Sequence, residues 1–266
     1  MDEPLPSAIP PTSPPPAPKA KGLFGWFAAL GLLALKFGAL ALQSLKTSLS
    51  MLLMIWAYSW LYGWRFAAGF VVLIFVHEMG HVFAAKRLGM PITAPIFIPF
   101  MGAYISMKQN PRDAWTEAWM AYGGPLAGCL GSWVCWFIAL QGDIPWLMAV
   151  ASASFVINLF NMIPIPPLDG GRICAAVSPW FWFVGILLLG ASVFYFHAWS
   201  AIGIAIIVLF IAIPRLKQTF LQKASPEMEQ YYATEPSKRV TMALLYVGLI
   251  AVLLLGYWDS SQRLGE

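Results

Sequence analysis

Long apolar runs separated by short polar loops constrain the fold of this chain more than any other feature. Of the 266 residues, 59% are hydrophobic and only 11% are charged, whereas soluble domains carry roughly 25% charge. A helix needs about 20 apolar residues to cross a bilayer. The candidate segments are residues 22–42, 46–64, 66–88, 115–140, 144–165, 173–196, 199–215 and 239–258. The sequence therefore predicts an all-α polytopic membrane protein with about six to eight transmembrane helices in a lipid bilayer.

Residues 91–107 interrupt this series of apolar helices. Pro91, Pro95 and Pro99 break any helix, and the isoleucines between them favour extended structure. Strand backbone at membrane depth is tolerated only where protein buries it or where it lines a cavity. We therefore expect a short β-hairpin in this stretch, either re-entrant or at the membrane interface.

The composition divides the chain into five regions. Residues 1–21 hold eight of the 21 prolines and are expected to form a disordered tail. The region 22–46 is expected to be an accessory apolar helix, which can lie in the interface because Lys36 interrupts it. The remaining regions are a core at 47–216, a cytoplasmic loop at 217–238, and an accessory transmembrane helix and tail at 239–266.

The basic residues predict how the chain is oriented in the membrane. Lys86, Arg87, Lys108 and Arg112 follow the segment 66–88, and a second basic group flanks the loop 217–238. Because cytoplasmic loops are enriched in lysine and arginine, both regions are expected to be cytoplasmic. The net charge of +4 is small and concentrated in such loops, so we expect no nucleic-acid partner.

A His-Glu-Met-Gly-His sequence lies at residues 77–81, near the end of an apolar segment. Residues four apart share one face of a helix, so His77 and His81 can both bind one zinc ion. Glu78 then lies beside the metal and can accept a proton from a water molecule there. Polar side chains inside a membrane helix are energetically unfavourable, and they usually have a function. The sequence therefore predicts a zinc hydrolase with its active site inside the membrane, nearer the cytoplasmic face.

A zinc hydrolase needs a third protein ligand, and the chain has only three histidines. The third, His197, is expected in a turn at the opposite membrane face. Asp169 is the better candidate, because it lies in a proline- and glycine-rich segment, 161–172, that leaves a predicted helix at the level of the histidines. The alternative is that Asp169 is a helix N-cap or a turn residue.

The two motifs together, H-E-M-G-H and N-x2-P-x-P-P-L-D-G-G-R, resemble those of the site-2 proteases, which are intramembrane zinc metalloproteases. This resemblance covers about residues 47–216. It implies one zinc ion per chain, bound by His77, His81 and Asp169, with Glu78 as the catalytic base. It also implies that Asn161 holds the substrate peptide or the oxyanion. The alternative for Asn161 is that its amide only satisfies backbone groups near the prolines.

Two further stretches agree with this resemblance. The sequence Gly123–Gly128 is similar to a glycine-proline element of the family that lets helices approach closely. The segment 91–107 has the place of the family's membrane hairpin, which implies that Gly102, Ala103 and Tyr104 contact substrate. The chain resembles a minimal member, without a PDZ or nucleotide-binding domain, close to the archaeal or sporulation-type branches. A prokaryotic cell membrane is the expected location.

The predicted function is therefore cleavage of transmembrane segments in membrane-bound substrates, as in regulated intramembrane proteolysis. The substrate would unwind near the site and add as a strand to the 91–107 hairpin. One alternative is a metal- or proton-coupled transporter that uses the same polar residues, although no symmetric interrupted helices are visible. Another is an inactive homologue that keeps the metal. A di-iron desaturase would need more histidines than the three present.

Overall fold

The computed structural model describes residues 23–265, apart from 94, 100–101, 105–108, 197–198 and 222–224. The predicted disordered tail and His197 therefore lie outside the described residues. The chain divides into two compact units, residues 1–43 and 44–266. Every site described below belongs to the second unit.

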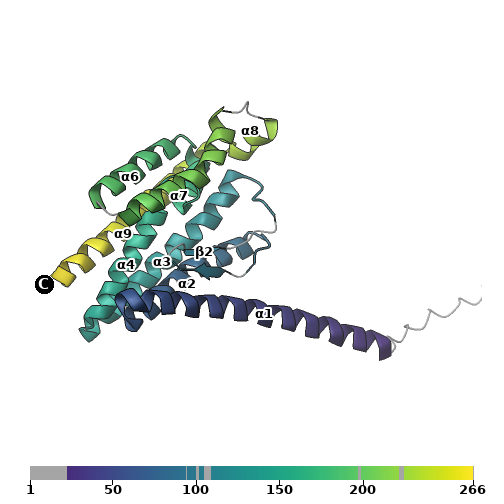
Figure 1. Ribbon diagram of the computed structural model, residues 1–266. Coiled ribbons are helices and arrows are strands. Elements are labelled where there is room, and N and C mark those ends of the chain that lie inside the picture. Colours follow the sequence, from purple (N-terminus) through teal and green to yellow (C-terminus); the bar gives the residue numbers. More distant parts are fainter. Residues whose placement is uncertain are drawn as a thin grey trace, which may run out of the picture. The chain divides into compact units, whose positions relative to one another are not determined.

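Helices make up most of the described chain (Figure 1). The helices are α1 (Leu23–Tyr62), α2 (Trp64–Arg87), α3 (Ala114–Gly142), α4 (Pro145–Asn161), α5 (Asp169–Val177), α6 (Phe181–Phe196), α7 (Trp199–Leu216), α8 (Pro226–Tyr232) and α9 (Pro236–Gly265). A short π-helical turn, η1 (Lys217–Leu221), follows α7, and two strands, β1 (Ile96–Ile98) and β2 (Gly102–Tyr104), lie between α2 and α3. The predicted all-α character is confirmed.

Two predicted helix boundaries are wrong. The separate segments 22–42 and 46–64 are parts of one helix, α1, because the polar residues between them do not break a helix as proline or glycine would. Conversely, the single segment 173–196 is two helices, α5 and α6. The break falls at Ser178, which is extended at φ −166° and precedes Pro179. A residue before proline is disfavoured in helical conformation, and proline itself lacks the N–H that a helix interior needs.

Four helical stretches of the described chain are long and apolar enough to cross a membrane. They are Trp64–Arg87, Ala114–Gly142, Ile202–Leu221 and Pro236–Gly265, and two shorter apolar helical stretches are Pro145–Asn161 and Phe181–Ala191. Large apolar side chains such as Leu130, Val134 and Phe210 are at least 60% exposed. Such faces suit helices surrounded by lipid. An integral membrane protein is therefore supported, while the count of six to eight spans stays a prediction.

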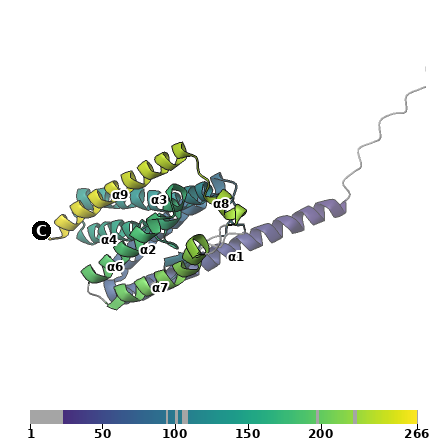
Figure 2. The same ribbon diagram turned by 90° about the horizontal axis from the view of Figure 1, so that it is seen from above.

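Helix α3 packs against α2, α4, α5 and α9, and Figure 2 shows α9 running beside it. The N-cap of α3 is Asp113, whose side chain accepts a 2.7 Å hydrogen bond from the Thr116 amide. Helices α2 and α3 touch backbone to backbone, because a Cβ on Gly80 would lie 2.1 Å from the Gly123 carbonyl oxygen. Only glycine fits there, as in other close membrane-helix contacts. This contact brings the histidine face of α2 against α3.

The short strands β1 and β2 pair in antiparallel register, with Phe97 opposite Ala103. The outer edge of β1 is hydrogen-bonded to side chains of α1. The Phe97 amide donates to Ser50 Oγ at 3.0 Å, and Thr47 Oγ1 donates to the Pro95 carbonyl at 2.7 Å. The placement of these strands relative to a membrane, predicted above, remains a prediction.

Candidate metal centre

The two histidines of α2 point toward α3, where glycine leaves room for them. A Cβ on Gly124 would lie 2.2 Å from His81 Nε2 and 2.8 Å from His77 Nε2. Any other residue at position 124 would therefore push the imidazoles out of place. The glycine-proline element of α3 thus makes space for the site as well as for the helix contact.

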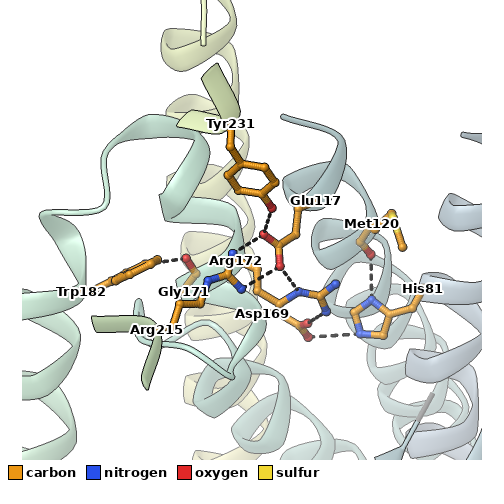
Figure 3. A network of polar contacts seen from close by, with 9 residues as sticks. All are labelled: His81, Glu117, Met120, Asp169, Gly171, Arg172, Trp182, Arg215 and Tyr231. Atoms are coloured by element: carbon orange, nitrogen blue, oxygen red, sulfur yellow. Dashed lines mark hydrogen bonds and ion pairs between the residues drawn. The ribbon is translucent and has the colours of Figure 1, made fainter. Parts of the chain in front are cut away.

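Asp169 reaches the histidines from the first turn of α5. The chain leaves α4, turns through the proline-rich residues 162–168, and starts α5 at Asp169 itself. A Cβ on Gly170 would lie 2.1 Å from the Met162 carbonyl oxygen, so glycine allows α5 to pack on this turn. The indole of the fully buried Trp182 donates to the Gly171 carbonyl at 2.8 Å and holds the same turn from α6 (Figure 3).

The structure brings His77, His81 and Asp169 together. The two Nε2 atoms are 3.1 Å apart, and each lies 3.2 Å from Asp169 Oδ2. His77 and Asp169 are both only 6% exposed. Among the described residues, these three form the group of side chains able to hold a metal ion.

The far sides of both imidazole rings are hydrogen-bonded. His77 Nδ1 lies 2.9 Å from Asn158 Oδ1, and His81 Nδ1 lies 2.8 Å from the Met120 carbonyl oxygen. A carbonyl oxygen only accepts, so Nδ1 of His81 carries the hydrogen and the Nε2 of its neutral form bears a lone pair. The same holds for His77 against the amide oxygen. Two imidazole lone pairs and a carboxylate oxygen then face one another, an arrangement that a cation between them stabilises.

This donor set fits zinc. Ligand atoms about 2.0–2.1 Å from a tetrahedral zinc lie roughly 3.3 Å from one another, close to the separations above. Two histidines and one carboxylate are a ligand set of catalytic zinc sites, in which a fourth position stays open. Hydrogen bonds from the second ring nitrogen are also usual for histidine ligands.

The other predicted site residues are less closely tied to this centre. Glu78 is half-buried, and its carboxylate interacts electrostatically with both histidines and with Asp169. Asn161 Nδ2 donates to the Ile157 carbonyl of its own helix at 3.1 Å. Gly102, Ala103 and Tyr104 form β2, of which the backbone alone is described. Their roles stay predictions.

Asn158 is a residue of the site that the sequence did not reveal. It lies three residues before Asn161, is fully buried, and contacts the candidate ligand His77, 81 positions earlier. The available signal was an amide side chain inside the apolar run of α4, which also fits a buried helix-helix contact.

A second polar cluster adjoins the centre and was also missed. Glu117 of α3 accepts hydrogen bonds from Arg172 of α5 at 3.2 Å, from Arg215 of α7, and from Tyr231 of α8 (Figure 3). Arg172 Nη1 also lies 3.6 Å from Asp169 Oδ1, so it joins the cluster to a candidate ligand. We call Glu117, Arg172, Arg215 and Tyr231 the Glu117 cluster.

Comparison with known proteins agrees with this geometry. Residues 65–144 match the model of peptidase family M50, which confirms the resemblance to the site-2 proteases. The matched range contains His77, Glu78 and His81, whereas Asp169 lies beyond it. The zinc metalloprotease MJ0392 of Methanocaldococcus jannaschii is 29% identical over 140 residues. That alignment covers 49% of this chain and 40% of the relative, so the chain spans less than half of the relative's length.

Proposed function

Starting from this similarity to peptidase family M50, we propose that the chain is an intramembrane zinc metalloendopeptidase. It binds one zinc ion through His77, His81 and Asp169 and cleaves transmembrane segments of membrane proteins. The observation that carries this proposal is the mutual spacing of the three ligand atoms, 3.1 to 3.2 Å, with hydrogen bonds on the far side of both imidazoles. The apolar surface of the surrounding helices supports a membrane location.

Zinc, when bound, supplies Lewis acidity that polarises the scissile carbonyl and makes a water molecule acidic near neutral pH. The Glu78 carboxylate takes the proton of that water and then gives it to the leaving amine nitrogen. The Asn161 amide nitrogen has two hydrogens, and the bond to Ile157 uses one. The other can donate to the carbonyl oxygen as negative charge develops.

The hairpin offers one edge for a substrate strand. Because β1 is attached to Ser50 and Thr47 of α1, we assign substrate binding to the outer edge of β2. Phe97 directs its amide away from the ladder, so its partner Ala103 does the same from β2. Ala103→Pro removes this N–H and should slow cleavage of a transmembrane substrate far more than Ala103→Ser. Equal rates for the two variants would refute strand addition at β2.

The orientation proposed from the basic residues places the active site nearer the cytoplasmic face of a multi-pass membrane protein. Cysteines introduced near Lys86 or Lys238 should then be labelled only from the cytoplasmic side. Labelling from the outside by an impermeant reagent would reverse the topology.

The catalytic assignment is tested with Glu78→Gln in the full-length protein, reconstituted with a substrate that has one transmembrane helix. We expect zinc content and thermal unfolding close to wild type but loss of cleavage by at least about 100-fold. Glu227→Gln, an exposed glutamate of α8, is the matched control and should cleave normally. Near-normal cleavage by Glu78→Gln would remove Glu78 from the mechanism.

A further inference from the structure

We propose that Asn158 is a positioning residue that holds His77 in its metal-binding tautomer and orientation, an inference that rests on the metalloprotease function proposed above. Asn158 lies outside both sequence motifs of the site. Its role follows from a chain of hydrogen bonds. The chain begins at a backbone carbonyl of α4, passes through the Asn158 amide and determines which nitrogen of His77 faces the metal site.

The orientation of the Asn158 amide is determined by its own helix. Asn158 Nδ2 donates to the Ser154 carbonyl at 2.8 Å. A carbonyl oxygen cannot donate, so the amide nitrogen must face Ser154 and the amide oxygen must face His77. The amide oxygen is likewise only an acceptor. His77 Nδ1 therefore carries the hydrogen across their 2.9 Å contact, and Nε2 of neutral His77 presents its lone pair toward Asp169.

The packing around Asn158 makes any other orientation of its amide energetically unfavourable. The residue is 0% exposed, so neither water nor lipid replaces a lost hydrogen bond. A Cβ on Gly128 would lie 2.2 Å from Asn158 Oδ1, which means that the glycine of α3 provides the space through which the amide reaches α2. Gly128 and Asn158 thus act as a pair.

Asn161 supplies an internal comparison on the same helix. Its amide bonds to the Ile157 carbonyl within α4, as Asn158 bonds to Ser154. The difference is the second contact: the Asn158 oxygen crosses to His77 on α2. A purely local helix role would need only the first contact, so the second contact is what makes Asn158 a positioning residue.

The test compares zinc affinity in three variants of the full-length protein by competition with a chelator. Asn158→Leu keeps the branching of the side chain but loses the acceptor, and should weaken zinc binding about 10- to 100-fold. Asn158→Asp keeps an acceptor for His77 Nδ1 but loses the donor to the Ser154 carbonyl, so it should weaken zinc binding clearly less than Asn158→Leu does. Ser152→Ala, at another buried serine of α4, is the control and should not change zinc affinity.

Wild-type zinc affinity in Asn158→Leu, or equal losses in the Leu and Asp variants, would overturn the positioning role and leave the metal site intact. If Asn158→Leu does not fold, nitrogen NMR of the zinc-loaded wild type decides. A protonated Nδ1 on His77 supports the proposal, and an unprotonated Nδ1 contradicts it. A wild-type protein that binds no zinc would overturn the proposed function and this inference together.

Discussion

The metal centre and the Glu117 cluster adjoin each other, but they are built in opposite ways. In the candidate metal centre, three atoms with lone pairs or negative charge converge, and the cation that we propose there would complete them. In the Glu117 cluster, one carboxylate receives two guanidinium groups and a phenol, so its members satisfy one another. Burial, followed by the nearby charge of Glu117, raises the pKa of Tyr231, which keeps the phenol protonated as a donor. The first region is arranged for binding and the second for stability.

Removal of the Glu117 carboxylate should have the largest effect on stability. Glu117→Ala leaves the Arg172 and Arg215 guanidinium groups largely buried without their partner, and we expect the free energy of unfolding to fall by about 3–5 kcal/mol. Zinc affinity of the folded fraction should change by less than about tenfold, because the three proposed ligands are kept and Glu117 reaches them only through Arg172. Glu229→Ala, an exposed residue of α8, serves as the control. Unfolding of Glu117→Ala at the wild-type temperature would show that the cluster does not stabilise the fold.

A methyl group added inside the metal centre should weaken zinc binding strongly but reduce the stability of the fold only a little. Because a Cβ on Gly124 would overlap both imidazoles, Gly124→Ala should weaken zinc binding by roughly 10- to 100-fold. Its unfolding temperature without zinc should fall much less than that of Glu117→Ala. Gly190→Ala of α6 is the matched control, since nothing lies within 4 Å of the added carbon. Unchanged zinc affinity in Gly124→Ala would mean that the imidazoles do not both face α3 in the bound protein.

Removal of the Tyr231 hydroxyl should have the smallest effect on the free energy of unfolding. Tyr231→Phe removes one hydrogen bond to a charged group and should reduce the free energy of unfolding by about 1.5 kcal/mol, without a change in zinc affinity. Because the pKa is raised in the folded protein, this contribution is fully present below the ordinary tyrosine pKa of about 10 and is lost as pH rises above it. Tyr257→Phe, on an exposed part of α9, is the control. A Tyr231→Phe protein as stable as wild type at pH 7 would show that the phenol adds nothing to the cluster.

The contrast between the two regions also explains why the candidate metal ligands could be predicted from the sequence and the Glu117 cluster could not. His77 and His81 are visible because helix geometry converts a four-residue spacing into one face, and Asp169 is visible because its proline-glycine segment is unusual. The members of the Glu117 cluster come from four elements spread over 115 positions, from 117 to 231. These residues are not separated by a short, regular spacing in the sequence, so their contacts could be recognised only in the three-dimensional structure.

The errors in the fold have equally physical causes. Hydropathy locates apolar segments well, but it does not register backbone breaks inside them, and so the interruption at Pro179 was missed. It also places boundaries at polar residues that continue a helix, as in α1. Asn158 was overlooked because a buried amide in an apolar helix has many possible partners, and its actual partner, His77, is distant in the chain.

Zinc stoichiometry tests the central claim most directly. Metal analysis of the purified full-length protein should give about one zinc per chain for the wild type. His77→Ala and His81→Ala should each lose most of that zinc, while Glu117→Gln, next to the centre but outside it, should keep it. Unchanged zinc content in both histidine variants would contradict the assignment of the metal centre.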